Sequence, residues 1–215
     1  MADARAVGAD EPPNEAAVAR ALAALLAPDA FVCFDGGQVM EWAHTFIAVR
    51  DPRCHLFTPG MGHLGFGQPF ANAAKLAHPG RQVVNIAGDG AFGCTVQELE
   101  TAARYGLAVI NVVCNDSHWG MYKPIEEGVF KNPGMGTRLT NVNFAKVAEG
   151  FGCYGERVAR LEDLAPAFAR AAASKRPAVL DVAVRFTPHP MDRLWMEIVF
   201  ANVDLPLPQR ARKAA

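Results

Sequence analysis

The sequence lacks the features that mark membrane, secreted and nucleic-acid-binding proteins. No apolar stretch reaches the roughly 20 residues that span a bilayer. The acidic, proline-containing segment 1–14 has no hydrophobic core of a signal peptide. The net charge is −1 and no dense basic run lies inside the chain, so the usual footprint of a nucleic-acid-binding surface is missing. These absences predict a cytoplasmic protein that binds neither nucleic acid nor a membrane.

Cysteine is present but not in the spacing of a metal or disulfide site. The five cysteines are scattered along the chain, and no two of them form a CxxC pair. Cys33, Cys114 and Cys153 lie in or beside apolar runs, where a free cysteine behaves as a small buried hydrophobe. We therefore expect neither zinc ligands nor disulfides.

What the sequence does have is an alternation of helical and strand-like segments. Its 215 residues are 51% hydrophobic and 20% charged, which suits one globular domain with a sizeable core. Strands that alternate with helices favour a three-layer α/β/α fold, with a mostly parallel sheet flanked by helices. Helices are expected over 15–26, 38–48, 69–77, 95–105, 143–150 and 161–173, and strands over 30–34, 81–87, 108–114, 154–158 and 177–184.

Polar and glycine residues follow three of the predicted strands, at the point where each strand ends. The three segments are Asp35-Gly36-Gly37, Gly88-Asp89-Gly90 and Asn115-Asp116. The carboxyl ends of parallel strands lie on one edge of a sheet, which is where such sheets bind ligands. The sequence therefore predicts a binding site at this edge. The long irregular segment 116–141 beside it is also typical of a functional loop.

The segment Gly88-Asp89-Gly90-Ala91 has the chemistry of an anion site with a metal ion. Glycines allow backbone N–H groups to approach an anion, and the following helix offers its positive end. Asp89 could hold the Mg²⁺ that neutralises a diphosphate, since Mg²⁺ binds through one or two carboxylates and phosphate oxygens. Two alternatives remain at this point: Asp89 could merely cap the next helix, or the fold could bind a dinucleotide. The second is disfavoured because GDGAFG lacks the third spaced glycine of that fingerprint.

The whole segment resembles the diphosphate-binding motif of enzymes that depend on thiamine diphosphate (ThDP). That motif begins with GDG and ends in NN or a close variant, here Asn115-Asp116. Glu98-Leu99 and Thr101-Ala102 between them are similar to the acetolactate synthase and pyruvate decarboxylase branch. The resemblance extends over residues 15–185 and implies the diphosphate-binding domain, which is the C-terminal third of the usual polypeptide. Residues 1–14 are then expected to be a flexible N-terminus, and 186–215 a tail that could cover the active site.

The resemblance implies a set of metal ligands, position by position. Asp89 matches the first carboxylate, and Asp116 matches the second side-chain ligand, which is usually Asn in the family. His118 matches the residue whose backbone carbonyl completes the protein's share of the ligands. Since Asn115 and Asp116 are adjacent oxygen donors, which of them is the ligand stays open at this stage.

The resemblance also assigns contacts to the rest of the cofactor. The turn Gly36-Gly37-Gln38 is similar to the family's first diphosphate-contacting turn. The loop from Gly60 to Pro69 resembles the one beneath the aminopyrimidine ring, with the Gly62 carbonyl on the ring amine and Leu64 under the bend of the cofactor. The expected cofactor-binding residues are Gly36, Gly37, Gln38, Gly62, His63, Leu64, Gly88, Asp89, Gly90, Ala91, Asn115, Asp116, His118, Trp119, Gly120 and Met121.

One group that ThDP catalysis needs has no counterpart in this sequence. The glutamate that protonates the pyrimidine ring comes, in the family, from a separate pyrimidine domain across an interface, and no segment here resembles that domain. Glu98 belongs to the diphosphate motif and cannot take the role. The expected partner is therefore a pyrimidine-domain subunit in a hetero-oligomer. His63 and His118 are the candidate catalytic acid–base residues, and His189 could lie on a segment that closes over the site.

Together these observations predict a ThDP- and Mg²⁺-binding subunit or domain of an acetolactate-synthase-like enzyme. It would cleave or form carbon–carbon bonds next to the carbonyl of a small 2-oxoacid or acyl-CoA substrate. Three alternatives stay open: the small subunit of a two-chain decarboxylase of the sulfopyruvate type, a 2-hydroxyacyl-CoA lyase component, and a non-catalytic ThDP-binding domain. The sequence does not name the substrate.

Overall fold

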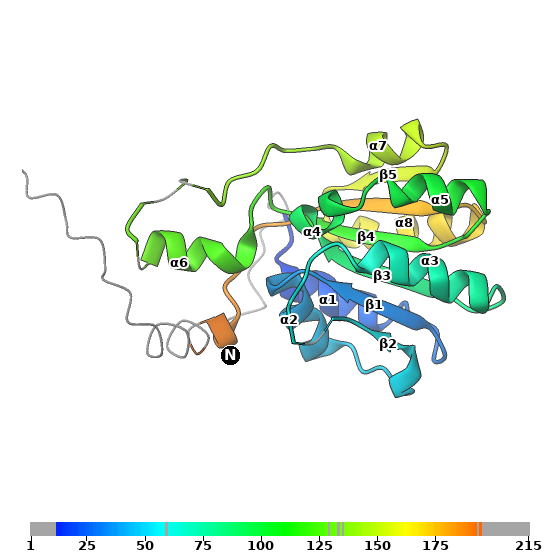
Figure 1. The fold of residues 1–215 in the computed structure, drawn as a ribbon, viewed down its shortest axis with the longest axis horizontal. Helices are drawn as coiled ribbons and strands as arrows, with labels where there is room; N and C mark the ends of the chain where they lie inside the picture. The colour runs from blue at the N-terminus through cyan, green and yellow to red at the C-terminus, as the bar shows by residue number, and fades with distance from the viewer. Residues whose placement is uncertain are drawn as a thin grey trace, which may run out of the picture.

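The fold is built around a parallel sheet. The computed structural model describes residues 12–194 except 59, 129, 133, 135 and 193. Within them, six strands run parallel in the order β2-β1-β3-β4-β6-β5 (Figure 1). The strands are β1 Phe31–Asp35, β2 His55–Leu56, β3 Val83–Gly88, β4 Ile110–Asn115, β5 Tyr154–Val158 and β6 Ala178–Ala183.

Helices cover both faces of the sheet, so the predicted three-layer α/β/α fold is confirmed. One face packs against α1, α2 and α8, and the other against α3, α5 and α7. Successive residues of a strand point to opposite faces: Val32 and Phe34 pack with the first group of helices, whereas Phe31 and Cys33 pack with the second. The helices are α1 Glu15–Ala23, α2 Gln38–Phe46, α3 Gly67–Ala77, α4 Asp89–Cys94, α5 Glu98–Arg104, α6 Lys123–Gly128, α7 Phe144–Gly150 and α8 Leu161–Ala173.

Buried polar side chains tie the central strands together on the α3/α5/α7 face. Asn85 of β3 donates to the amide oxygen of Asn111 on β4 over 2.9 Å, and Asn111 donates to the backbone oxygen of Ala178 at the start of β6. Asp181 of β6, which is fully buried, accepts from the side chain of Asn115 and from the Arg157 guanidinium. Polar groups that are buried in pairs keep their hydrogen bonds, so they fix the strand register without a large penalty.

The predicted elements are present, with two local differences. The expected loop 51–67 contains the short strand β2, which exists because it pairs with β1 at Val32 and Cys33. The helix expected over 95–105 is preceded by a separate helix, α4, which already begins at Asp89. The two helices are separated because the backbone of Thr95 leaves the helical conformation, with φ −134° and ψ 28°. Its hydroxyl donates to the Gly65 backbone oxygen.

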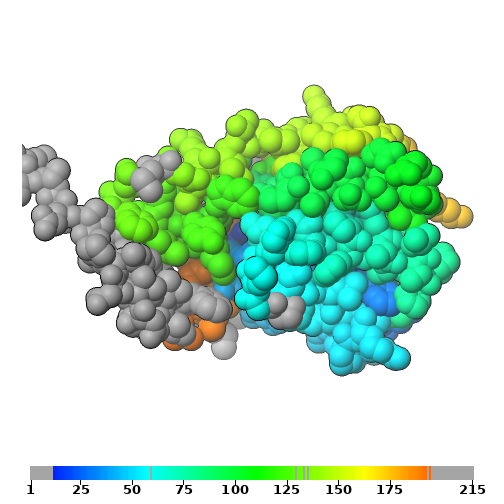
Figure 2. Space-filling model, viewed as in Figure 1, coloured from blue at the N-terminus to red at the C-terminus, as the bar shows by residue number. Residues whose placement is uncertain are grey.

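The irregular segment 116–141 forms an arm that stands out from the sheet. It carries the short helix η2 Gly120–Tyr122 and then α6, which packs against η2 rather than against the core. Figures 1 and 2 show this green arm projecting beside the carboxyl ends of the strands. Glu126 accepts hydrogen bonds from the Gly136 N–H and the Thr137 hydroxyl, which folds the arm back on itself.

The two ends of the described chain meet at the same edge of the sheet. Asn14 lies beside Arg185 in a parallel bridge, directly after β6 ends, so α1 begins at the carboxyl edge. The following segment turns onto α2, where the Trp42 indole N–H donates to the Thr187 backbone oxygen over 2.9 Å. Residues 1–11 and 195–215, most of the two predicted termini, lie outside the described residues.

Among the residues that the structure describes, no helix combines the length and the apolar character needed to cross a bilayer. All five cysteines are free thiols, as the sequence predicted, and four of them are buried. The expectations of a cytoplasmic location and of no nucleic-acid binding stay predictions.

Candidate functional site

A cavity of about 340 Å³ opens at the carboxyl ends of β1, β3 and β4. It lies at the point where the chain changes direction: β1 leads outward to β2 through α2, whereas β3 leads to β4 through α4 and α5. The two connections separate there and leave a crevice, the usual ligand site of open parallel sheets. The volume falls within the roughly 300–1,000 Å³ of small-molecule pockets.

Glycines allow the walls of the cavity to approach each other closely. A Cβ atom on Gly37 would lie 2.7 Å from the Met121 sulfur, and one on Gly90 would lie 2.5 Å from the Trp119 ring. Real Cβ atoms do not come this near to other heavy atoms, so side chains on the β1 and β3 turns would displace the η2 segment. The same bare backbone leaves N–H groups open to an anion.

Asp35 holds the loop that forms the far wall. Its buried carboxylate accepts from the Gly65 N–H over 3.1 Å and from the Gly67 N–H over 2.8 Å. This fixes the loop after β2 against the end of β1, so that Gly62 and Leu64 line the cavity. Burial raises the pKa of Asp35. Its role in the structure is to position the loop, a function that the sequence pattern alone did not suggest.

Asp89 and Asp116 each bring a carboxylate oxygen without a partner into the cavity. One oxygen of Asp89 accepts from the Gly90 N–H over 2.8 Å, and one oxygen of Asp116 accepts from the His118 N–H over 3.0 Å. The second oxygen of each residue is buried and has no hydrogen-bond partner in the described part of the chain. Buried polar atoms are nearly always satisfied, so these two acceptors at neighbouring strand ends, both on residues that line the cavity, are available to water or to a ligand that donates or carries positive charge.

The charge at this end of the cavity is poorly compensated. Burial first, and then the charge of Asp116, raises the pKa of Asp89 to about 7. Burial also raises the pKa of Asp116. A hard divalent cation would remove both penalties, since it favours carboxylate oxygens and is itself a positive charge. Among the described residues, no three His, Cys, Asp or Glu side chains form a cluster that could hold a metal ion, so remaining ligands would come from backbone, water or diphosphate oxygens.

Asn115 points away from the cavity. Its side-chain N–H groups donate to the Val142 backbone oxygen over 2.8 Å and to Asp181 over 3.0 Å, on the buried α3/α5/α7 face. Alternation along β4 explains the difference, because Asn115 and Asp116 lie on opposite sides of the strand end. Of the two residues that the sequence left open, Asp116 is therefore the one that lines the cavity.

The two candidate catalytic histidines lie in different places. His118 lines the cavity, with Nδ1 2.7 Å from the Asp116 backbone oxygen and Nε2 3.3 Å from Nζ of Lys123. His63 is exposed, its Nδ1 lies 2.7 Å from the Leu64 backbone oxygen, and it does not line the cavity. His189 packs edge-on against Trp42, 3.1 Å from the Thr45 hydroxyl, on the outer side of α2. Their catalytic roles stay predictions.

The structure brings together every predicted cofactor-binding residue except His63 and Asn115. It also adds lining residues that sequence reasoning missed. Val39, Met40, Phe57, Thr58, Gly60, Cys114 and Tyr122 flank predicted positions and could have been found by extending each motif. The remaining one, Glu15, is far from every motif in the sequence, and only the tertiary structure places it in the cavity.

Comparison with known proteins agrees with this geometry. Residues 35–182 match the family model described as "Thiamine pyrophosphate enzyme, C-terminal TPP binding domain". The matched segment begins at the β1 turn and ends in β6, so it contains Asp89, Asp116 and the glycine turns of the cavity. The fold and site define a ThDP-binding domain. The chain belongs to the thiamine pyrophosphate enzyme family.

Individual relatives include several activities. The chain is 39% identical over 161 residues to a probable acetolactate synthase of Mycobacterium bovis, covering 75% of this chain and 29% of that protein. It is 33% identical over 183 residues to pyruvate oxidase of Lactiplantibacillus plantarum, covering 84% of this chain and 30% of the relative. The chain thus spans under a third of the length of these curated relatives.

A solved structure has the same fold. The ThDP-dependent 4-hydroxybenzoylformate decarboxylase of Rhodococcus jostii superposes with a TM-score of 0.78 at 28% sequence identity, over 87% of this chain and 35% of the other. The similarity therefore covers one part of that enzyme. The names of these proteins give three different activities, so they do not identify the substrate of this chain.

Proposed function

We propose that this chain is the ThDP- and Mg²⁺-binding subunit or domain of an acetolactate-synthase-like enzyme. In it, a carbon–carbon bond next to the carbonyl of a 2-oxoacid would be cleaved or formed. The observation that supports this most directly is the pair of buried, unpartnered carboxylate oxygens of Asp89 and Asp116. They lie beside glycine turns at the switch point of the sheet, where a cation could join a diphosphate to the protein.

Each wall of the cavity has a separate task in this proposal. Asp89, Asp116 and the His118 carbonyl would hold the cation, and the turns at Gly36–Gln38 and Gly88–Ala91 would hold the diphosphate through backbone N–H groups. Leu64 and the Gly62 carbonyl would set the shape of the bound cofactor. When bound, ThDP supplies the carbanion chemistry that the protein's own side chains lack.

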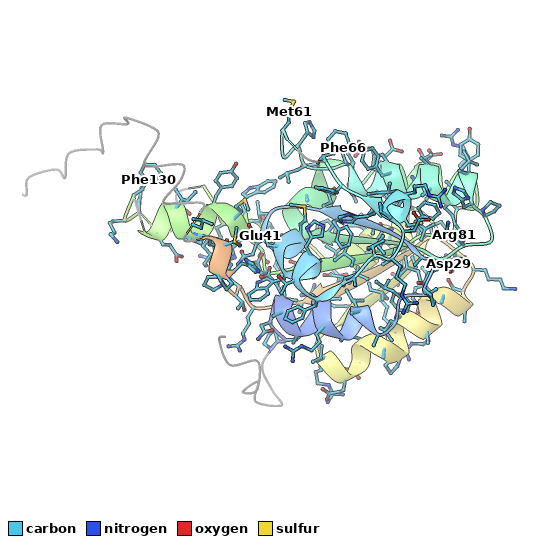
Figure 3. All side chains as sticks on the ribbon, turned by 90° about the horizontal axis from the view of Figure 1, so that it is seen from below. Asp29, Glu41, Met61, Phe66, Arg81 and Phe130 are labelled. Atoms are coloured by element: carbon cyan, nitrogen blue, oxygen red, sulfur yellow. The ribbon has the colours of Figure 1, made fainter. Side chains whose placement is uncertain are left out.

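We also propose that the site is completed by a pyrimidine-domain partner. The chain corresponds to under a third of its relatives' length, and no residue of the cavity matches the glutamate that activates the cofactor in the family. The loop after β2 projects from the surface, with Met61 92% exposed at its tip (Figure 3).

Calorimetric titration of the purified chain with ThDP tests the cofactor assignment. The titration is done once in the presence of Mg²⁺ and once in EDTA. We expect Mg²⁺-dependent binding in the wild type and its loss, at least about 100-fold, in Asp89→Asn, because the amide removes the charge that holds the cation. Asp163→Asn, an exposed acid on α8 that pairs with Arg160, is the matched control and should bind like the wild type. Equal ThDP affinity in wild type and Asp89→Asn would refute the assignment.

The partner is tested by turnover. The chain with ThDP, Mg²⁺ and a panel of 2-oxoacids should give no product by itself. Full turnover of the purified chain without any other protein would show that the partner proposal is wrong.

A further inference from the structure

Glu15 is a buried acid that none of the assigned roles explains. It is the first residue of α1, only 3% exposed, and it lines the same cavity as Asp89 and Asp116. The parallel bridge between Asn14 and Arg185 brings it there, because it joins the start of α1 to the carboxyl end of β6. A third carboxylate thus reaches the cavity from an element outside the diphosphate motif.

The Glu15 carboxylate is only partly satisfied. Its Oε2 atom is buried without a hydrogen-bond partner among the residues that the structure describes, as are Oδ2 of Asp89 and Oδ2 of Asp116. Among the described residues, the charges of Asp116, Asp192 and Asp89 oppose its ionisation. Burial first, and then these charges, raise its pKa well above the usual range. The location at the N-terminus of a nine-residue helix offsets this cost in part, since that end favours negative charge.

A structural role for Glu15 is a real alternative. Hydrogen bonding with the backbone of Thr187 lowers its pKa, so one side of the carboxylate contacts the C-terminal segment. An anchor for this segment, however, needs neither a full charge nor a second, unpaired oxygen on a residue that lines the cavity. Glutamine, which has the same shape and keeps an acceptor oxygen, could hold Thr187 equally well. An anchoring role for Glu15 therefore does not explain why its Oε2 atom is unpaired.

We propose that Glu15 is a third carboxylate of the cation site, which lets this cavity bind a divalent cation before the diphosphate arrives. The inference rests on the proposed function and deepens it. With two carboxylates, much of the cation's affinity comes from the cofactor's own phosphate oxygens. A third negative charge on the protein raises the affinity of the empty cavity for the cation, so that less of this affinity depends on the cofactor's phosphate oxygens.

Glu15 would act through water rather than by direct contact with the ion. The described residues contain no ready three-carboxylate cluster around one point. Mg²⁺ and similar ions keep several bound waters in such sites, and a buried acceptor such as Oε2 can take a hydrogen bond from one of them. An outer carboxylate of this kind adjusts cation affinity without changing the inner ligands.

The test uses Mn²⁺ alone as the probe, with the full chain at pH 8 and free Mn²⁺ measured by electron paramagnetic resonance. We expect the wild type to bind one Mn²⁺ without ThDP and Asp89→Asn to lose this binding. Glu15→Gln should bind it about tenfold more weakly, the effect of one charge acting through a partly screened medium. Glu162→Gln is the matched control, because Glu162 is also an acid in the first turn of a helix but lies on the exposed side of α8.

Thermal unfolding of the same variants separates the cation role from the anchoring role. If Glu15 serves the cation, Glu15→Gln keeps or raises the melting temperature without metal and loses part of the stabilisation by Mn²⁺. Equal Mn²⁺ affinity in Glu15→Gln and wild type, or no Mn²⁺ binding by the wild type without ThDP, would overturn the inference. Neither result would touch the proposed function, whose test is ThDP binding with Mg²⁺ present.

Discussion

Two groups of buried carboxylates in this molecule differ in one respect, the number of their oxygens that are paired. Asp181, inside the α3/α5/α7 face, accepts from Asn115, from the Phe144 N–H over 3.0 Å and from Arg157 over 2.9 Å. Asp89 and Asp116, at the edge of the same sheet, each keep one buried oxygen without a partner. Both kinds are almost removed from solvent, so burial alone does not mark a functional acid here.

The comparison gives a physical criterion for separating architecture from binding. A buried charge whose hydrogen bonds are all made within the chain stabilises the fold and leaves nothing for a ligand. A buried charge with an unpaired oxygen costs stability in the empty protein and regains it when a cation or donor arrives. Asp181 and Asp35 meet the first description. Asp89, Asp116 and Glu15 meet the second and also line the cavity, whereas Asp192 has an unpaired oxygen but does not line it.

The largest effect on stability is expected when the hydrogen bonds of the fully paired carboxylate, Asp181, are broken. Asp181→Asn replaces an acceptor by an amide, whose N–H₂ then faces the donors of Asn115, Phe144 or Arg157. We expect a loss of about 2–4 kcal/mol in the free energy of unfolding, measured by urea denaturation, because a buried ion pair and its hydrogen bonds are lost together. Asp163→Asn breaks an exposed pair with Arg160 instead and should cost less than ~1 kcal/mol. Equal losses in the two variants would mean that the Asp181 network contributes no more than a surface pair.

The next largest effect is a gain in stability, expected for a substitution of Asp89, and it depends on pH. The pKa of Asp89 is raised to about 7, above the roughly 3.9 of an unfolded chain. The empty protein therefore binds more protons than the unfolded state between these values, and its stability falls as pH rises from 4 to 7. Asp89→Asn removes this penalty, so we expect it to be more stable than the wild type at pH 8 without metal, by on the order of 2 kcal/mol.

Thermal melts of both proteins at pH 5 and pH 8 measure this difference. At pH 5 the folded carboxyl is still protonated while the unfolded one is already largely ionised, so only part of the loss has occurred and the two curves should lie closer together than at pH 8. A wild type that is more stable than Asp89→Asn at pH 8 in EDTA would show that the carboxylate is satisfied by the protein itself.

A smaller effect, on ThDP affinity, is expected from a substitution in the glycine turn beside Asp89. Gly90→Ala would place a Cβ 2.5 Å from the Trp119 ring, so the η2 segment must shift away from the β3 turn. We expect ThDP affinity in Mg²⁺ to fall about tenfold, since a strained or displaced wall costs on the order of 1–3 kcal/mol. Gly93→Ala, one turn further along α4, meets no atom within 4 Å and serves as the control. Similar affinity in both variants would contradict a close approach between these walls.

The positions of the two cavity carboxylates depend on local sequence, so they could be predicted. Asp89 and Asp116 follow apolar strands directly, and parallel strands bring such ends to one edge. The parallel sheet, the flanking helices and the cavity at this edge follow from the same alternation, whereas the order of the strands came only from the structure. Helix and strand ends differ from the structure by a few residues, as expected where caps and side-chain contacts decide them.

The parts that sequence reasoning missed depend on contacts between distant segments. Nothing around Glu15 indicates a site, because only the pairing of Asn14 with Arg185 carries it to the cavity. The choice between Asn115 and Asp116 needed the strand's orientation, which Asp181, far along the chain, reveals by its hydrogen bond to Asn115. β2 is two residues long and, among the described strands, pairs only with β1, so no run of apolar residues in the sequence predicts it.

The most direct measurement of the central claim compares Asp89→Asn and Asp181→Asn in the same two assays, ThDP affinity in Mg²⁺ and melting temperature in EDTA at pH 8. Asp89→Asn should lose ThDP binding and gain thermal stability. Asp181→Asn should lose stability and, at a temperature where it is folded, keep ThDP binding within a few-fold. Changes of the same sign in both variants would contradict the claim that the unpaired carboxylates, and not buried carboxylates in general, form the cofactor site.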